Sequence, residues 1–247
     1  MLNACINSSI TYGCEAWSYG NFSPVNILHR KAIKMILGVR QNISNSIIYT
    51  ESDTIPIENT IKCQQLKYWI KINEYGSNKP ESHIWNIITT ATHLEIPFIK
   101  YYQQLESTYQ NPIDCHAILK NEFIDSVINE FSLSDDQDSV LGTYKSINPT
   151  LTTLNINSSI IEPDRLLITR YRTGSHHLKI ETGRWSCTER NLRICDKCNL
   201  DKLQSLNHMI TECVLTSDYH FNGNLENFFA SDTCVKTLKF IDSHCKL

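Results

Sequence analysis

The sequence predicts a mainly α-helical protein, in which a long helical region is followed by a basic helix and a small CCHC zinc-knuckle module. Three observations predict this class. Apolar residues recur at helical spacing over much of the 247-residue chain. Three cysteines and one histidine have the spacing of a metal site, and the segment that leads into them carries an excess of positive charge.

The first helices are predicted from apolar periodicity and from start and stop signals. Residues 2–17 are apolar-rich and are predicted to form one helix. Ser23 and Pro24 are typical of an N-cap and a first helical position. The apolar residues that follow keep helical spacing as far as Gly38, which is a typical C-terminal stop. A second strong helix is predicted over residues 57–73.

Four more segments have helical patterns of differing strength. Residues 80–92 and 96–109 are predicted as helices with weaker caps, and residues 115–131 show clearer periodicity. A basic helix is predicted over residues 163–173 and is expected to end at Gly174.

The metal-site pattern is Cys-x2-Cys-x9-His-x4-Cys, formed within 19 residues by Cys195, Cys198, His208 and Cys213. Zinc prefers four ligands in a tetrahedron and binds thiolate sulfur and imidazole nitrogen. His208 and Cys213 are five residues apart, about 140° around a helix, so a helix end or a turn is needed to bring them together. Structural zinc is the predicted cofactor; the alternative is four ordinary residues in a cysteine-rich chain.

Other cysteines and histidines offer weaker metal sites. Cys187 lies eight residues before Cys195 and is a possible substitute ligand. Cys234 and Cys245 are a second option, together with His244, although a structural role is the simpler interpretation for them.

Charge is distributed unevenly around a formal net value of −3. Residues 101–164 contain ten Asp and Glu against two Lys and Arg, whereas residues 165–202 contain nine Lys and Arg against four Asp and Glu. A basic stretch beside a small zinc module is typical of a phosphate-binding surface. An ordinary solvated charged face is the alternative.

Several other classes are excluded by what the sequence lacks. It contains no run of about 18 apolar residues, so no membrane partner is expected. No secretory signal is found at its start, and its ten cysteines are interpreted as reduced intracellular thiols, in the nucleus or the cytoplasm. Gly-rich phosphate loops and a Gly-x-Ser-x-Gly motif are also absent.

The basic segment and the metal-site pattern together resemble the C-terminal region of non-LTR (LINE-type) retrotransposon reverse transcriptases. That family carries the pattern Leu-x3-Arg-x-Gly-x-His-x-Leu, then Gly-Arg, then Arg-x-Cys-x2-Cys, then His-x4-Cys. This sequence contains Arg172-Thr-Gly-Ser-His176-His-Leu178, Gly183-Arg184, Arg193-Ile-Cys195-Asp-Lys-Cys198 and His208-x4-Cys213. The motifs stand in the family's order.

The N-terminal half adds two weaker similarities. Tyr12-Gly-Cys-Glu15-Ala-Trp17 resembles the family's Tyr-Gly-x-Glu-x-Trp segment, which follows the polymerase palm. Residues 29–39 and 67–69 resemble the thumb-like helices that come next, so the resemblance covers the thumb and the zinc-binding tail.

Two departures from the family matter. Acidic residues usually precede the motif histidine, but residues 204–207 read Gln-Ser-Leu-Asn. The palm's Tyr-x-Asp-Asp turn, whose carboxylates would hold two Mg²⁺ ions, is not in this sequence. Its single Asp-Asp pair, Asp135-Asp136, is predicted to lie in a polar loop, so no catalytic residue is assigned.

The resemblance implies a binding role rather than catalysis. The residues expected to contact nucleic acid come from the basic segment: Arg170, Arg172, His176, Arg184, Trp185, Arg190 and Arg193. Trp185 is a candidate for stacking on an unpaired base or for a core position. Surface exposure without a role is the alternative for His176 and its neighbour His177.

The chain is divided accordingly into a helical thumb-like region (1–131), an acidic polar linker that includes the unassigned segment 141–157 (132–164), a basic helix with the zinc module (165–220) and a C-terminal tail (221–247). Expected partners are RNA or DNA and the polymerase domain of a parent element. Two alternatives stay open. One is a transposon-derived helical relic that interacts with proteins only; the other is the tail of an active RNA-directed DNA polymerase truncated in the gene model.

Overall fold

The computed structural model describes residues 2–17, 20–74, 83, 90, 97–133, 139–151 and 160–245. Over these ranges the regular elements are helices, and extended pairing is limited to one isolated antiparallel bridge between Ile194 and Leu203. The mainly α class is therefore confirmed. In the same ranges, no helix combines the length and the apolar character needed to cross a membrane.

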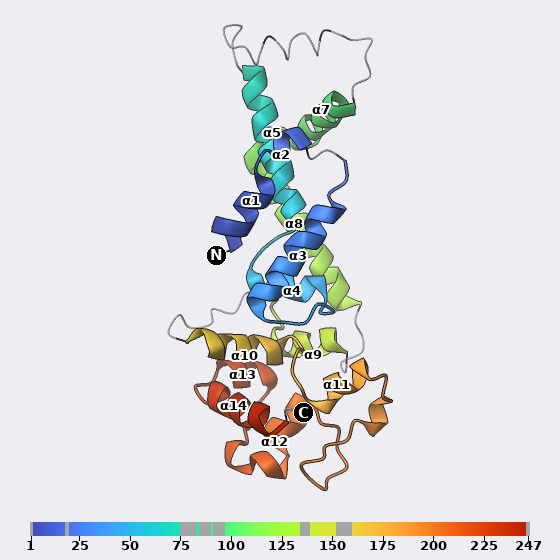
Figure 1. Cartoon of the computed structure of the whole chain (residues 1–247), viewed down its shortest axis with the longest axis vertical. Coiled ribbons are helices and arrows are strands. Elements are labelled where there is room, and N and C mark those ends of the chain that lie inside the picture. The colour runs from blue at the N-terminus through green and yellow to red at the C-terminus, as the bar shows by residue number, and fades with distance from the viewer. Residues whose placement is uncertain are drawn as a thin grey trace. The chain divides into compact units, whose positions relative to one another are not determined.

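Two compact units make up the chain, which Figure 1 shows coloured by residue number. The first unit consists of Met1–Ala32 and Thr54–Ile128, and the second of Ile33–Asp53 and Asn129–Leu247. These units are defined by spatial compactness. The division of the chain inferred from the sequence concerns function, and it stays a prediction.

Among the described residues, the first unit contains all or most of seven helices: η1 (Leu2–Asn7), α1 (Ser8–Thr11), α2 (Cys14–Trp17), α3 (Ser23–Leu37), α5 (Ile57–Glu74), α7 (Pro97–Tyr109) and α8 (Pro112–Ser132). The single helix predicted over residues 2–17 is wrong. A π-helical turn opens this segment, and α1 and α2 are separated by Tyr12, whose backbone is extended, and Gly13. Gly13 has φ +65°, a conformation that glycine adopts readily and that interrupts a helix.

The later helices of this unit agree with the predictions. Gly38, with φ +64°, follows the last residue of α3, and α5, α7 and α8 cover the segments predicted from periodicity. In the core of the unit, the rings of Trp69 on α5 and Tyr102 on α7 stack with centroids 5.1 Å apart. The helix predicted over residues 80–92 lies almost entirely outside the described residues.

The second unit contains shorter elements: α4 (Asn45–Ser52), α9 (Val140–Ile147), α10 (Glu162–Arg172), α11 (Lys179–Trp185), η2 (Arg190–Leu192), α12 (Leu206–Thr211), η3 (Val214–Tyr219), α13 (Leu225–Ala230) and α14 (Cys234–Cys245). Helix α10 is the predicted basic helix. Pro163 stands in its first turn, and Gly174, with φ +71°, follows its C-cap. Helix α9 covers the first part of the segment 141–157, for which the sequence predicted no element.

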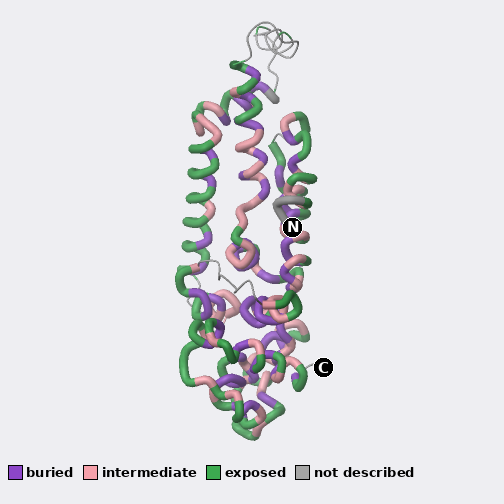
Figure 2. The backbone as a smooth tube through the Cα atoms, turned by 90° about the vertical axis from the view of Figure 1, so that its left-hand side faces the viewer, coloured by how far each residue is buried: buried purple, intermediate pink, exposed green. Residues whose placement is uncertain are grey.

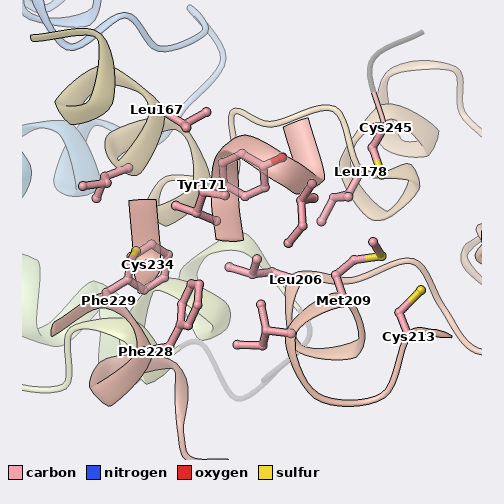
Figure 3. Close-up of a cluster of buried hydrophobic side chains, with 14 of the residues drawn as sticks. Leu167, Tyr171, Leu178, Leu206, Met209, Cys213, Phe228, Phe229, Cys234 and Cys245 are labelled. Atoms are coloured by element: carbon pink, nitrogen blue, oxygen red, sulfur yellow. The ribbon is translucent and has the colours of Figure 1, made fainter. Parts of the chain in front are cut away.

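A hydrophobic core joins helices α10, α12, α13 and α14 of this unit (Figure 3). Helices α10, α12, α13 and α14 each contribute buried side chains, among them Tyr171, Leu206, Met209, Phe228 and Leu238. Buried positions alternate with exposed ones along the helices, as Figure 2 shows, because each helix turns one apolar face inward. Burying side chains of this size contributes about 1.5–3 kcal/mol each. The core therefore fixes α12, which carries a predicted metal ligand.

Candidate metal centre

A short backbone hairpin presents the first two cysteines. The amide of Cys195 donates to the carbonyl of Lys202 at 2.8 Å, and the amide of Gln204 donates to the carbonyl of Arg193 at 3.0 Å. These bonds close the chain around the isolated Ile194–Leu203 bridge. The loop between them carries Cys198, and its last turn is made by Asp201, which has φ +48°. Both cysteines therefore come from one turn, as the Cys-x2-Cys spacing predicts.

Helix α12 and its C-terminal end present the other two residues. The Ser205 hydroxyl caps the helix by accepting from the amide of His208 at 3.2 Å. After the helix ends, the amide of Cys213 donates to the carbonyl of His208 at 3.0 Å. This hydrogen bond joins residues i and i+5 in place of the i and i+4 of a regular α-helix, and it turns Cys213 back toward His208. It is the helix end that the spacing of these two residues requires.

The four side chains converge. One ligand atom from each of Cys195, Cys198, His208 and Cys213 lies within 4.8 Å of all the others. The sulfurs of Cys195 and Cys213 are 3.9 Å apart, and the sulfur of Cys198 is 3.3 Å from Nε2 of His208. A tetrahedron with Zn–S bonds of about 2.3 Å has S–S edges of about 3.8 Å. The arrangement therefore has the dimensions of a tetrahedral metal site.

Burial keeps the Cys213 thiol protonated until a metal binds. It raises the pKa of the Cys213 thiol to about 12, and the neighbouring Cys195 and Cys198 add to the rise. Because a metal binds the thiolate, loading the site releases protons. The centre thus favours a cation that competes well for soft sulfur ligands over one that prefers oxygen.

Glu212 contacts the outer side of the histidine. Since Nε2 of His208 faces Cys198, the other ring nitrogen, Nδ1, points away from the thiols, and Oε2 of Glu212 lies 3.5 Å from it across one helical turn. Nδ1 is buried, and no shorter hydrogen-bond partner occurs in the described part of the chain. A carboxylate in this place orients a metal-bound histidine. No acidic residue directly precedes His208, and Glu212, four residues after it, was not predicted although the i,i+4 spacing can be read from the sequence.

Replacing Glu212 by glutamine is expected to weaken metal binding by about tenfold without unfolding the protein, because carboxylates that orient metal-bound histidines typically contribute 10- to 100-fold to affinity. Competition with a chromophoric chelator measures the affinity. Glu226→Gln is the matched control, since Glu226 is exposed on α13 and lies outside the cluster. Equal affinities for the two variants would show that Glu212 does not support His208.

Gln204 ties the hairpin to helix α11. This buried side chain accepts from the amide of Lys179 at 2.9 Å and donates to Oδ1 of Asp196 at 3.0 Å. Its amide nitrogen also lies 3.8 Å from the sulfur of Cys195. Gln204 therefore fixes the hairpin and places a hydrogen-bond donor beside the sulfur of Cys195.

The structure places two predicted nucleic-acid contacts in the core. Arg172 is fully buried, and its guanidinium makes a bidentate ion pair with Glu51. His176 is buried too, where its ring stacks on Tyr171 with centroids 4.9 Å apart. Burial lowers the pKa of His176 to about 3, so the ring stays neutral. Neither side chain is available to a phosphate, and the prediction for both requires correction.

Three more of the predicted residues are engaged within the protein. Arg193 donates to the backbone carbonyls of Ile180 and Thr188. Arg184 is half-buried and pairs with Glu181 at 3.1 Å. Trp185 is half-buried, and the guanidinium of Arg40 lies over its ring, so that face is closed to a stacking base.

Arg170 and Arg190 are the predicted residues that retain surface. Arg170 is exposed and donates one hydrogen bond to the carbonyl of Gly38. Arg190, on η2, is half-buried. Lys197 and Lys202 of the hairpin are exposed as well. Of the seven residues predicted, Arg170 and Arg190 are therefore the ones considered further, and Lys197 and Lys202 add exposed positive charge in the hairpin.

The other cysteines and the histidine considered as metal ligands do not form a cluster in the described part of the chain. Cys187 is exposed and lies outside the four-residue cluster. Cys234 and Cys245 are buried in the hydrophobic core, and Nδ1 of His244 lies 2.8 Å from the carbonyl of Phe240. Asp135 and Asp136 lie outside the described residues.

Comparison of the chain with protein-family models, with curated proteins and with solved structures finds no match. The class of the protein therefore rests on its own features: a helical chain with a compact Cys3His centre that can hold a metal ion.

Proposed function

We propose that the Cys3His centre holds structural zinc. Three thiolates and one imidazole are the donor set of many structural zinc sites, and four protein ligands leave no open position for a reacting water. The short contacts among the sulfurs and Nε2 of His208 support this assignment. All ten cysteines are free thiols, which fits a reducing intracellular setting.

We further propose that the chain binds RNA or DNA, as a region derived from the C-terminal part of a non-LTR retrotransposon reverse transcriptase. The observation that carries this proposal is the convergence of four ligands whose sequence pattern matches the zinc-binding tail of that family. In this proposal the first unit corresponds to the thumb-like region, and the polymerase domain of a parent element is its partner. The role is positioning of template or target, because the sequence contains no Tyr-x-Asp-Asp turn.

The contacts to phosphate are assigned to the side chains that keep surface: Arg170, Arg190, Lys197 and Lys202. Lys197 and Lys202 flank Cys198 in the hairpin, so a metal that orders the hairpin also orders two positive charges. Phosphate contacts of this kind bind without regard to sequence and weaken with salt.

Binding of a single-stranded oligonucleotide is expected to weaken about 50-fold between 50 and 200 mM salt, because four phosphate contacts give a slope of about −2.8 in a log–log plot. Lys202→Ala is expected to reduce the slope to about −2.1. Fluorescence anisotropy over a salt series measures both, with zinc content checked by native mass spectrometry before and after EDTA. Lys120→Ala, at an exposed site on α8, serves as the control.

One observation favours a second function, that of a helical protein-interaction module without a nucleic-acid role. Arg172, Arg184 and Arg193 stabilise the fold internally, so the excess of arginine in this segment has a structural explanation. Zinc-loaded protein that binds neither RNA nor DNA at 50 mM salt would favour this function over the proposed one.

A further inference from the structure

A cavity of about 380 Å³ lies in the second unit, beside the metal centre. Its walls come from α9, the C-terminal end of α10, α11, η2, the start of α12 and the start of α13. This volume is within the range of about 300–1,000 Å³ that is typical of small-ligand sites. No residue of the Cys3His cluster lines it, so it is a separate site.

The lining of the cavity mixes apolar and polar side chains. Ile180 and Leu206 are buried apolar residues, and Leu225 is half-buried. Arg172, His176 and Glu181 are buried polar residues of the same lining. Asn207 and Asn224 also line the cavity but are exposed. A ligand that fits must therefore combine apolar surface with hydrogen-bonding groups.

The two exposed amides have capacity for a ligand. Oδ1 of Asn224 accepts from the amide of Asn227 and caps α13, whereas its Nδ2 makes no hydrogen bond to the described part of the chain. The amide of Asn207 makes none there either. Each amide side chain can donate and accept at once, and asparagine is a common reader of base edges because it offers both.

The charges around the cavity are largely compensated within the protein. The Nε and Nη2 atoms of Arg172 bind Glu51, and Glu181 pairs with Arg184. A small free anion would find little uncompensated charge here, whereas a neutral heteroaromatic ring, with flat apolar faces and hydrogen-bonding edges, matches this mixed lining.

The metal centre and the cavity share one segment of chain. Ser205, Leu206 and Asn207 line the cavity and immediately precede His208. The hydroxyl of Ser205 accepts from the amide of His208. Fixing His208 on a metal therefore fixes the part of the lining that carries Asn207.

We propose that this cavity accepts an unpaired nucleobase of a bound single strand, with the base against Ile180, Leu206 and Leu225 and its edge toward Asn207 and Asn224. This inference rests on the proposed nucleic-acid binding. It specifies that the protein recognises a base of the strand in addition to its phosphates. Phosphate contacts supply affinity, and the cavity distinguishes a strand that can place a base in it from one that cannot.

The test compares two fluorescent 12-nucleotide DNA strands of equal charge, one carrying bases throughout and one made of abasic deoxyribose units. Zinc-loaded full-length protein is expected to bind the base-bearing strand about 5- to 100-fold more tightly, since one stacked base contributes about that factor. Asn207→Ala is expected to reduce the difference and Asn207→Phe, which fills the mouth of the cavity, to abolish it. Asn191→Ala and Asn191→Phe are matched controls at an exposed position of η2 outside the lining.

The possible outcomes separate this inference from the proposed function. Equal affinity of the wild-type protein for the two strands at low salt would overturn the base site and leave phosphate binding in place. Absence of binding by either strand would overturn both. If a free nucleoside monophosphate binds in a manner sensitive to Asn207 while the strand does not compete, the cavity takes a free nucleotide and the inference about a strand is wrong. Zinc content is measured for each variant, so loss of the metal is not mistaken for loss of the base site.

Discussion

Cys198→Ser is expected to abolish tight metal binding and to unfold the hairpin and helix α12, while the helices of the first unit remain folded. A metal ion held by the four side chains would link the hairpin to helix α12, and the two are otherwise joined by few backbone hydrogen bonds. In zinc-finger peptides the apparent free energy of metal binding is about 10–16 kcal/mol and is also folding free energy. Serine is a much poorer zinc ligand than a thiolate, so most of this stabilisation is lost.

Hydrogen exchange read by mass spectrometry measures the effect over residues 193–213. Protection there should fall to the level of the wild-type protein treated with EDTA, and peptides from α5 and α8 should be unchanged. Cys187→Ser is the matched control, because Cys187 is an exposed thiol outside the cluster. Unchanged protection over residues 193–213 in Cys198→Ser would contradict a structural role for the metal.

The loss should extend beyond the ligands. Leu206, Met209 and Ile210 of α12 are buried in the core of the second unit. When α12 loosens, this apolar surface is exposed, at a cost of about 1.5–3 kcal/mol for each side chain. We therefore expect partial loss of protection in α10 and α14, which pack in the same core (Figure 3).

Glu51→Gln is expected to lower the free energy of unfolding of the second unit by about 3–5 kcal/mol, because it leaves the charge of Arg172 buried without a counter-ion. The two side chains are 0% and 4% exposed and are joined by a contact of 2.6 Å between Nη2 and Oε1. The hydroxyl of Tyr144 also donates to Oε1 of Glu51, at 2.7 Å. The variant thus disturbs a network of three buried groups.

Denaturant titration followed by tyrosine and tryptophan fluorescence measures this change. Asp164→Asn removes half of an ion pair in the same unit whose other member, Lys239, is 53% exposed, and it should cost only about 1 kcal/mol. The double variant Glu51→Leu, Arg172→Met should recover much of the loss, because an apolar pair of similar volume carries no charge to desolvate. Equal stability of Glu51→Gln and Asp164→Asn would mean that the buried pair does not stabilise the fold.

Helices with strong local signals were predictable from the sequence. The Ser-Pro start and glycine stop of α3, the apolar stripe of α5 and the proline-to-glycine limits of α10 depend on residues that are neighbours along the chain. Helices α11, α12 and α13 are short, at 6 or 7 residues. Short helices are stabilised mainly by tertiary packing. For this reason they were not predicted from the local sequence pattern.

The same distinction applies to the candidate centre. By itself the sequence determined the helical class and the four ligands, because ligand type and spacing are written within 19 residues. Only the tertiary structure decided which of the arginines are buried and paired and which are exposed. Arg172 looks like its basic neighbours in the sequence, but its partner Glu51 lies 121 residues away. Whether a charge is buried or exposed depends on which distant groups fold against it, and no local pattern records that.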